Sequence, residues 1–178
     1  MKNIADHMFD IFENSVNAKA TEVKIIISYE NNIFFCSISD NGFGISGPEV
    51  LDPFYTTRKT RKVGLGLPLL KKTTEDTGGY LKVNRINENG GTYLEFKINM
   101  SHIDAKPFGD LSNAFLDIIF AWPDINLKIY FEKYHQKKII FNAEKIKKQM
   151  EKDKTAFFEI RNRISCILKD EFNKIGIL

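Results

Sequence analysis

Residues 33–45 read IFFCSISDNGFGI, and they decide how the rest of the chain is interpreted. The first seven form a strand-like run, which Asp40 ends with a carboxylate. Gly42 and Gly44 follow at alternate positions, where a backbone without side chains lets a flat ligand approach within contact distance. The stretch therefore predicts the floor of a pocket with a polar residue that recognises the ligand. An ordinary Asp-Asn-Gly turn is the alternative, and the rest of the chain must decide between the two.

Composition limits the classes of protein to consider. The chain has 178 residues, 43% of them hydrophobic and 28% charged, which fits one globular domain with or without an appendage. The sequence has no apolar run of about 20 residues and no secretory signal pattern, so we expect a cytoplasmic protein without a membrane partner. A net charge of +3 does not favour a nucleic-acid partner. Cys36 and Cys166 are expected to be buried thiols.

The first eighteen residues predict an amphipathic helix from residue 2 to about 18, because apolar residues recur with a helical period. Asp10 and Asn14 are four residues apart and therefore share a face of this helix, with Glu13 and Asn17 beside them. That face could hold a metal ion.

Two hairpins are predicted from strand-like runs. Residues 23–29 pair with 33–39, so that the pocket stretch follows the end of a strand. Residues 80–86 pair with 91–99, and Thr92 stands at the start of the second strand of this hairpin.

The segment 51–63 has neither helical nor strand periodicity and predicts a loop or lid. It carries the aromatic residue Phe54. Four cations follow within five residues, and a solvated charge run is the alternative interpretation. These cations are Arg58, Lys59, Arg61 and Lys62.

A glycine-containing segment, Gly64-Leu65-Gly66-Leu67, leads from this loop into a helix that runs to about residue 76. Glycines before a helix N-terminus expose backbone N–H groups, which suit a phosphate. The sequence lacks both the GxxxxGK[ST] motif of P-loop proteins and the third glycine of a Rossmann fingerprint. A different nucleotide-binding architecture is therefore needed.

The ordered motifs resemble those of the ATP-binding domain of the GHKL superfamily, which unites gyrase, a heat-shock chaperone, histidine kinases and mismatch-repair ATPases. An N box reads DIFENSVNAKAT, and the later boxes read DNGFGI, DPFYTTR, GLGL and GGT over residues 10–92. The resemblance implies an α/β (α+β) two-layer sandwich of the Bergerat type. In that fold a mixed sheet is covered by helices on one face, and ATP and Mg2+ are the expected ligands.

The resemblance also implies roles for individual residues. Asp40 would accept a hydrogen bond from the adenine amino group, and Thr92 would share a water with it. Asn14 would coordinate Mg2+. The adenine ring would lie against Gly42 and Gly44, and Phe54 would be the lid aromatic.

The remaining implied contacts concern the rest of the nucleotide. Gly64 and Gly66 would cap the phosphates, and Arg58, Lys59, Arg61 or Lys62 would neutralise the γ-phosphate when the lid closes. Further residues of these boxes are expected at the nucleotide. They are Asn17, Ile45, Leu65 and Leu67.

Two departures from the family pattern concern catalysis. Asp10 is the candidate base, but it stands where hydrolytic members have a glutamate and is one methylene shorter. Glu13 points about 100° away around the helix and is a poor substitute. Asn17 stands where histidine kinases commonly have a lysine.

The second part of the chain, residues 100–178, predicts an α+β appendage. It comprises a helix over 111–119, strands over 125–131 and 139–141, and helices over 143–151 and 155–174. The apolar face of the last helix predicts core packing, with a partner or homodimer surface as the alternative. We therefore expect an ATP-binding domain at 1–99 with a lid at about 52–63, and a C-terminal unit at 100–178.

The histidines give little support to a phosphoacceptor. His7, His102 and His135 lack the helical context of an acceptor, and no helical pair with such a histidine precedes the N box in this sequence, so a complete sensor kinase is not expected. Only the segment 101–104 is worth testing. The segment 102–110 is similar to a linker in small stand-alone GHKL proteins that accompany iron hydrogenase genes in anaerobic bacteria, which suggests a partner linked to hydrogenase systems.

We therefore expect a protein that binds Mg-ATP and acts on a protein partner or phosphoacceptor by phosphoryl transfer or slow hydrolysis. A non-catalytic, ATP-gated interaction module is the alternative. A DNA-acting ATPase of the mismatch-repair or topoisomerase kind is less favoured.

Overall fold

A computed structural model describes residues 1–44, 66–133, 136–144, 146 and 157–177. The predicted lid lies outside these residues, as does most of the helix predicted over 143–151. Ten elements follow one another along the described chain. They are α1 (Ile4–Asn17), β1 (Glu22–Glu30), β2 (Ile33–Asp40), α2 (Gly66–Glu75), β3 (Tyr80–Asn87), β4 (Gly90–Asn99), α3 (Leu111–Ala121), β5 (Asn126–Lys133), β6 (Gln136–Asn142) and α5 (Phe157–Lys174).

The six strands form a single mixed sheet in the order β3-β4-β2-β1-β5-β6. Both predicted hairpins are confirmed, because β1 pairs with β2 and β3 with β4, each antiparallel. β5 pairs with β1 in parallel, and β6 pairs with β5 antiparallel. The strands of the segment 100–178 thus extend the sheet begun by the first hairpin.

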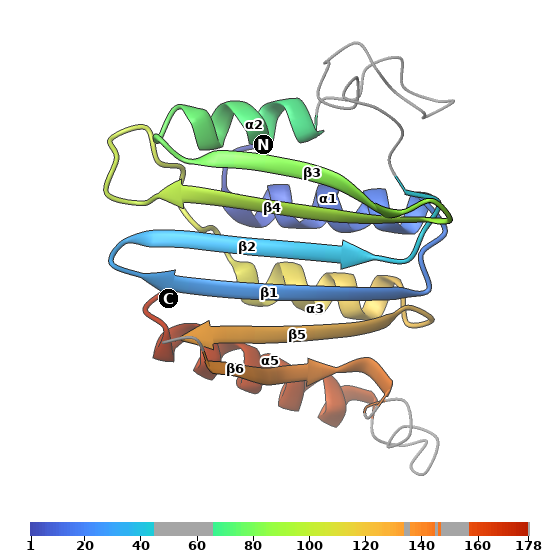
Figure 1. Ribbon diagram of the computed structural model, residues 1–178. Coiled ribbons are helices and arrows are strands. Elements are labelled where there is room, and N and C mark those ends of the chain that lie inside the picture. The colour runs from blue at the N-terminus through green and yellow to red at the C-terminus, as the bar shows by residue number, and fades with distance from the viewer. Residues whose placement is uncertain (45–65, 134–135, 145, 147–156, 178) are drawn as a thin grey trace.

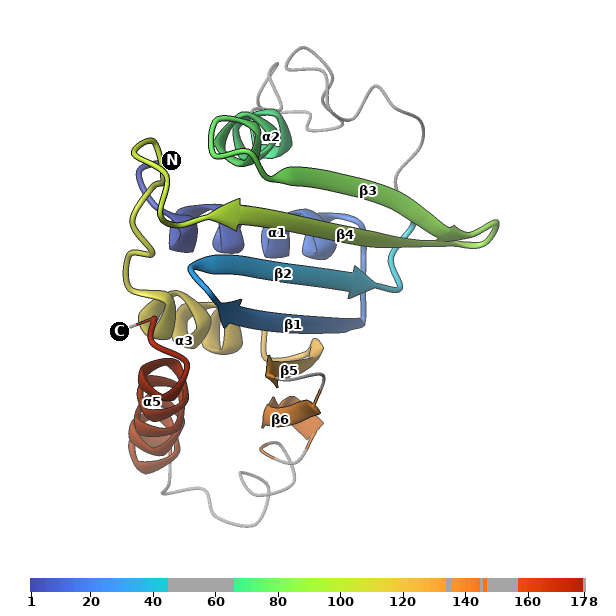
Figure 2. The same cartoon turned by 60° about the vertical axis from the view of Figure 1, so that its left-hand side comes forward.

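The helices α1, α2, α3 and α5 all lie on one face of this sheet (Figures 1 and 2). No described helix covers the other face. The molecule is therefore a two-layer α+β sandwich, as the family resemblance implied. Among the described residues, no helix has both the length and the apolar character needed to cross a membrane.

Strand alternation explains how the core forms between the two layers. Along β1 the buried side chains are Val23, Ile25 and Ile27, while Glu22 and Lys24 are exposed. Side chains at every second position share a face of a strand, so the apolar ones meet the apolar stripes of the helices. The same alternation continues in β2, β4 and β5, whose buried residues join one hydrophobic cluster.

The segment after β4 is fastened to the start of α1. The carbonyl oxygens of Pro107 and Phe108 accept hydrogen bonds from the N–H groups of Ile4 and Ala5, at 3.0 and 2.9 Å. Asp110 caps α3, because its side chain accepts from the N–H of Asn113. These contacts satisfy backbone donors that every helix leaves unpaired at its N-terminus.

The two cysteines differ in exposure. Cys36 is buried in β2, and burial raises the pKa of its thiol. Cys166 is exposed on α5, so the prediction that it is buried was wrong. On α5 the side chains of Ile164, Leu168 and Phe172 are buried, whereas Ile167 is 44% exposed.

Candidate functional site

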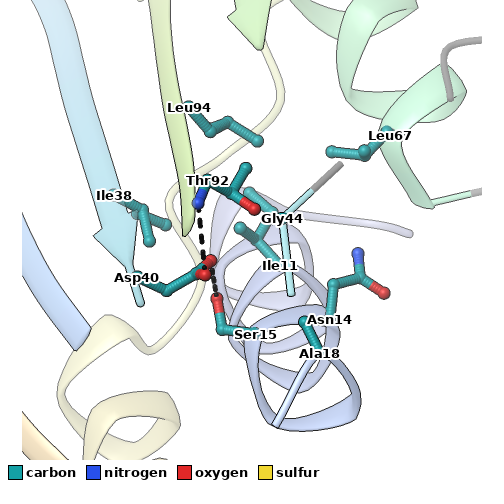
Figure 3. A pocket seen from close by; sticks show the side chains of 10 residues that line it. All are labelled: Ile11, Asn14, Ser15, Ala18, Ile38, Asp40, Gly44, Leu67, Thr92 and Leu94. Carbon is teal, nitrogen blue, oxygen red and sulfur yellow. Dashed lines mark hydrogen bonds between the residues drawn. The ribbon is translucent and has the colours of Figure 1, made fainter. Parts of the chain in front are cut away.

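The end of β2 and the start of β4 bring two polar side chains together. Asp40 and Thr92 are directly opposite each other in the antiparallel pair, and Ile38 pairs with Leu94 one step further into the sheet. Paired residues project from the same face of a sheet, and here α1 lies across that face (Figures 1 and 3). All four side chains therefore point into the space beside α1.

The C-terminal half of α1 supplies the opposite wall. Ile11, Ser15 and Ala18 are separated by four and three residues, so they lie on the side of the helix that faces the strand ends. Asn14 lies next to them and is half-buried (Figure 3). The wall is therefore apolar apart from one hydroxyl group and one amide.

A cavity of about 60 Å³ lies between these walls and the start of α2. Its lining is mainly apolar, with a few convergent polar groups, which is the usual character of a small-molecule site. The ten residues that line it are Ile11, Asn14, Ser15, Ala18, Ile38, Asp40, Gly44, Leu67, Thr92 and Leu94 (Figure 3).

Asp40 is buried in this cavity and is held by three donors. Its Oδ2 accepts a hydrogen bond from Ser15 Oγ at 2.9 Å. Its Oδ1 accepts from the N–H groups of Gly42 and Thr92, at 2.9 and 3.3 Å. Three donors from α1, the turn after β2 and β4 therefore fix one carboxylate in a single orientation.

The turn after Asp40 is packed tightly against neighbouring backbone. The N–H of Phe43 donates to Ala18 O at 2.8 Å, and Gly42 O accepts from the N–H of Gly91 at 2.7 Å. A Cβ atom on Gly42 would lie only 2.6 Å from Ala18 O. Gly42 therefore has a structural reason for lacking a side chain, in addition to the ligand contact predicted from the sequence.

Asp10 lies beside the first residue of α2. A Cβ atom on Gly66 would overlap the carboxylate of Asp10, so glycine is the residue that allows this approach. The contact joins the predicted N box to the predicted phosphate-binding segment. Asp10 does not belong to the described lining of the cavity.

The structure thus brings together several of the residues predicted to form the site. Asn14, Asp40, Gly44, Leu67 and Thr92 line one cavity, Gly42 donates to Asp40, and Gly66 touches Asp10. Asn17 is exposed at the end of α1 and is not among the residues that line the cavity. The other predicted site residues lie outside the described residues. They are Ile45, Phe54, Arg58, Lys59, Arg61, Lys62, Gly64 and Leu65.

Ser15 is a polar lining residue that the sequence analysis missed. It is 3% exposed and stands on the apolar stripe of α1, between Ile11 and Ala18. A polar residue on an otherwise buried helix face needs a hydrogen-bond partner, and this was the signal available in the sequence. The partner is the Asp40 carboxylate.

A comparison with protein families matches residues 2–102 to the model described as "Histidine kinase-, DNA gyrase B-, and HSP90-like ATPase". The chain belongs to this family. Its membership supports ATP binding by the domain whose cavity is described above. The GHKL resemblance inferred from the motifs is thereby confirmed.

Two solved structures illustrate the likeness of this family member to known proteins. The nucleotide-free catalytic domain of the histidine kinase ThkA is 26% identical, with a TM-score of 0.42, and the match covers 53% of this chain and 64% of that one. The N-terminal domain of a DNA repair protein is 14% identical, with a TM-score of 0.51. That match covers 80% of this chain and 53% of the DNA repair protein's chain. The second likeness concerns the fold alone, and it extends beyond residues 2–102. The chain spans less than two thirds of either relative.

Proposed function

We propose that the chain binds Mg-ATP in the cavity between α1, β2, β4 and the start of α2, with adenine at Asp40. The observation that supports this most directly is the buried Asp40 carboxylate, which three donors orient at the end of a mainly apolar cavity. Such a carboxylate is an acceptor for the amino group of a flat base. Thr92 and Gly44 line the same cavity and would contact the base or its bridging water.

The phosphates would lie toward α2 and Asn14. Asn14 lines the cavity, and its side-chain oxygen would suit Mg2+, which binds few protein ligands and keeps several waters and phosphate oxygens. When bound, Mg2+ would neutralise phosphate charge. Gly66 and Leu67 at the N-terminus of α2 would approach the phosphates with their backbone. The cations Arg58, Lys59, Arg61 and Lys62 are proposed to complete this end of the site.

ATP would then serve phosphoryl transfer to a protein partner or slow hydrolysis. Asp10 is the candidate base for these reactions, and its proximity to Gly66 supports a position near the phosphates. An ATP-gated module without chemistry is the second candidate, favoured by the short side chain of Asp10. A hydrogenase-linked partner and a homodimer through the C-terminal region belong to the same proposal.

The binding proposal is tested by calorimetry with Mg-ATP on Asp40→Asn. An amide at this position presents a donor to the adenine amine, so we expect the Kd to rise at least about 100-fold. Asp110→Asn is the matched control, because asparagine caps α3 equally well at a site remote from the cavity. Equal affinity of Asp40→Asn and the wild type would contradict the adenine assignment.

The use made of ATP is tested with a labelled γ-phosphate. Free phosphate indicates hydrolysis, and a labelled protein indicates transfer. Tight binding with neither product supports the gated module.

A further inference from the structure

The hydrogen bond between Ser15 and Asp40 joins two buried side chains 25 residues apart in the chain. Ser15 is 3% exposed and Asp40 is 7% exposed, so the donor and acceptor are both shielded from water. A hydrogen bond to an ionised acceptor in such surroundings is among the stronger ones in proteins. This pair therefore has the strength to control how the carboxylate presents itself to a ligand.

A count of lone pairs shows what remains available on Asp40. A carboxylate offers about four acceptor positions, two on each oxygen. The N–H groups of Gly42 and Thr92 occupy those of Oδ1. Ser15 takes one on Oδ2 at 2.9 Å. One acceptor position is thus left, and it belongs to the same oxygen that Ser15 holds.

The hydroxyl group of Ser15 has a single proton, which is committed to Asp40. Toward the cavity, Ser15 Oγ and Asp40 Oδ2 therefore both present lone pairs. An exocyclic amine can donate to them, whereas a carbonyl oxygen in the same place would meet acceptors only. Such a pair would favour a 6-amino over a 6-oxo purine.

We infer that Ser15 is a positioning residue that gives the site its preference for a 6-amino purine, by fixing the orientation and the open acceptor of Asp40. This inference rests on the proposed binding of ATP in this cavity. Ser15 acts through Asp40. Loss of the Ser15 hydroxyl group should therefore reduce what the 6-amino group contributes to the binding affinity and leave the other nucleotide contacts intact.

The test compares Ser15→Thr with Ser15→Val by calorimetry or competition binding. The two replacements have the same shape, but only threonine keeps the hydroxyl group. Each variant is measured with three nucleotides in the presence of Mg2+: ATP, a purine ribonucleoside triphosphate without the 6-amino group, and inosine triphosphate with a 6-oxo group. Ser15→Ala repeats the comparison without added bulk, in case both larger side chains disturb α1.

For Ser15→Val and Ser15→Ala we expect ATP to bind about tenfold more weakly than to the wild type, while the analogue without the amino group changes less than about twofold. The affinity of Ser15→Thr for ATP and for the analogue without the amino group should stay within about threefold of the wild-type values. The preference for ATP over inosine triphosphate should fall with the loss of the hydroxyl group. Unchanged binding of the analogue also shows that the variants are folded.

If Ser15 had a purely structural role, its loss would weaken the binding of ATP and of the analogue equally, and that result would overturn the inference. Unchanged ATP affinity in Ser15→Val and Ser15→Ala would overturn it as well. Failure of the proposed function looks different, because the wild type would then bind none of the three nucleotides.

Discussion

At the scale of single residues, Gly66 and Asp10 lie in close contact between α1 and α2. A Cβ atom on Gly66 would overlap the Asp10 carboxylate. Alanine normally favours a helix over glycine by about 1 kcal/mol, but here the added Cβ atom displaces the Asp10 carboxylate from its position against Gly66. We therefore expect Gly66→Ala to lower the free energy of unfolding by up to about 1 kcal/mol, the cost of moving the Asp10 side chain from its rotamer, measured by urea denaturation.

The control is the same substitution in an Asp10→Ala background. Without the carboxylate the added methyl group has space, so Gly66→Ala should become neutral or stabilising. Equal destabilisation in both backgrounds would show that the contact with Asp10 does not determine the requirement for glycine.

Residue-level features were predictable where a motif fixes them. Asp40, Thr92, Asn14 and Leu67 were predicted from ordered motifs, and the structure places all four around one cavity. Ser15 was not, because its partner is 25 residues away and helical periodicity only assigns it to a buried stripe.

At the scale of elements, His7 links α1 to α2. Thr73 Oγ1 donates to Leu69 O, so it accepts from Nε2–H of His7 at 3.3 Å, and Nδ1 has no hydrogen-bond partner among the described residues. The pKa of His7 is lowered to about 4, mainly by burial. The positive charges of Lys106 and the amino terminus also lower this pKa, whereas the negative charge of Asp6 raises it.

This pKa predicts a pH-dependent stability. The unfolded chain takes up a proton on His7 near pH 6.5, whereas the folded chain resists protonation down to about pH 4. The contribution of His7 is therefore complete above pH 6.5 and is lost as the pH falls toward 4, by up to about 3 kcal/mol. Urea denaturation at several pH values measures this slope.

Two substitutions isolate the histidine responsible. His7→Gln stays neutral, so its stability should fall less than that of the wild type between pH 6.5 and 4. His102→Gln is the control, because His102 is exposed and should leave the wild-type slope unchanged. An identical slope in His7→Gln and the wild type would rule out this origin.

Element boundaries were predicted within a few residues wherever the apolar period was long. The helix expected over 2–18 is α1, Ile4–Asn17, and the strand expected over 125–131 is β5, Asn126–Lys133. The ends differ because capping decides them: the Asn3 side chain accepts from the N–H of Asp6 and so starts α1 two residues later than the period suggested.

At the scale of the whole molecule, the position of β5 was beyond what the sequence could predict. Alternating residues in 125–131 indicate a strand, but they do not say which strand it joins. Its partner is β1, about a hundred residues earlier, in parallel register from Glu22↔Asn126 to Ile27↔Phe131. Parallel pairing needs a long connection and carries no local turn signal, unlike a hairpin.

This arrangement leads to a prediction about residues 1–99 in isolation. Without the remaining chain, β1 loses its parallel partner, and the rings of Phe9 and Phe12 lose Trp122, which lies 5.4 and 5.6 Å from them between centroids. An exposed apolar strand edge and an uncovered aromatic pair favour aggregation over folding. We expect the fragment to show no cooperative thermal transition by circular dichroism.

The division into units 1–99 and 100–178 predicts the opposite. If the fragment unfolds cooperatively near the Tm of the full chain and binds ATP with similar affinity, the first unit is an independent domain and the second an appendage. If instead ATP binding returns only when residues 100–178 are supplied as a separate chain, the two parts fold as one sheet. Complementation is expected because β5 and the Pro107–Phe108 carbonyls satisfy backbone groups of β1 and α1 that the fragment leaves unpaired.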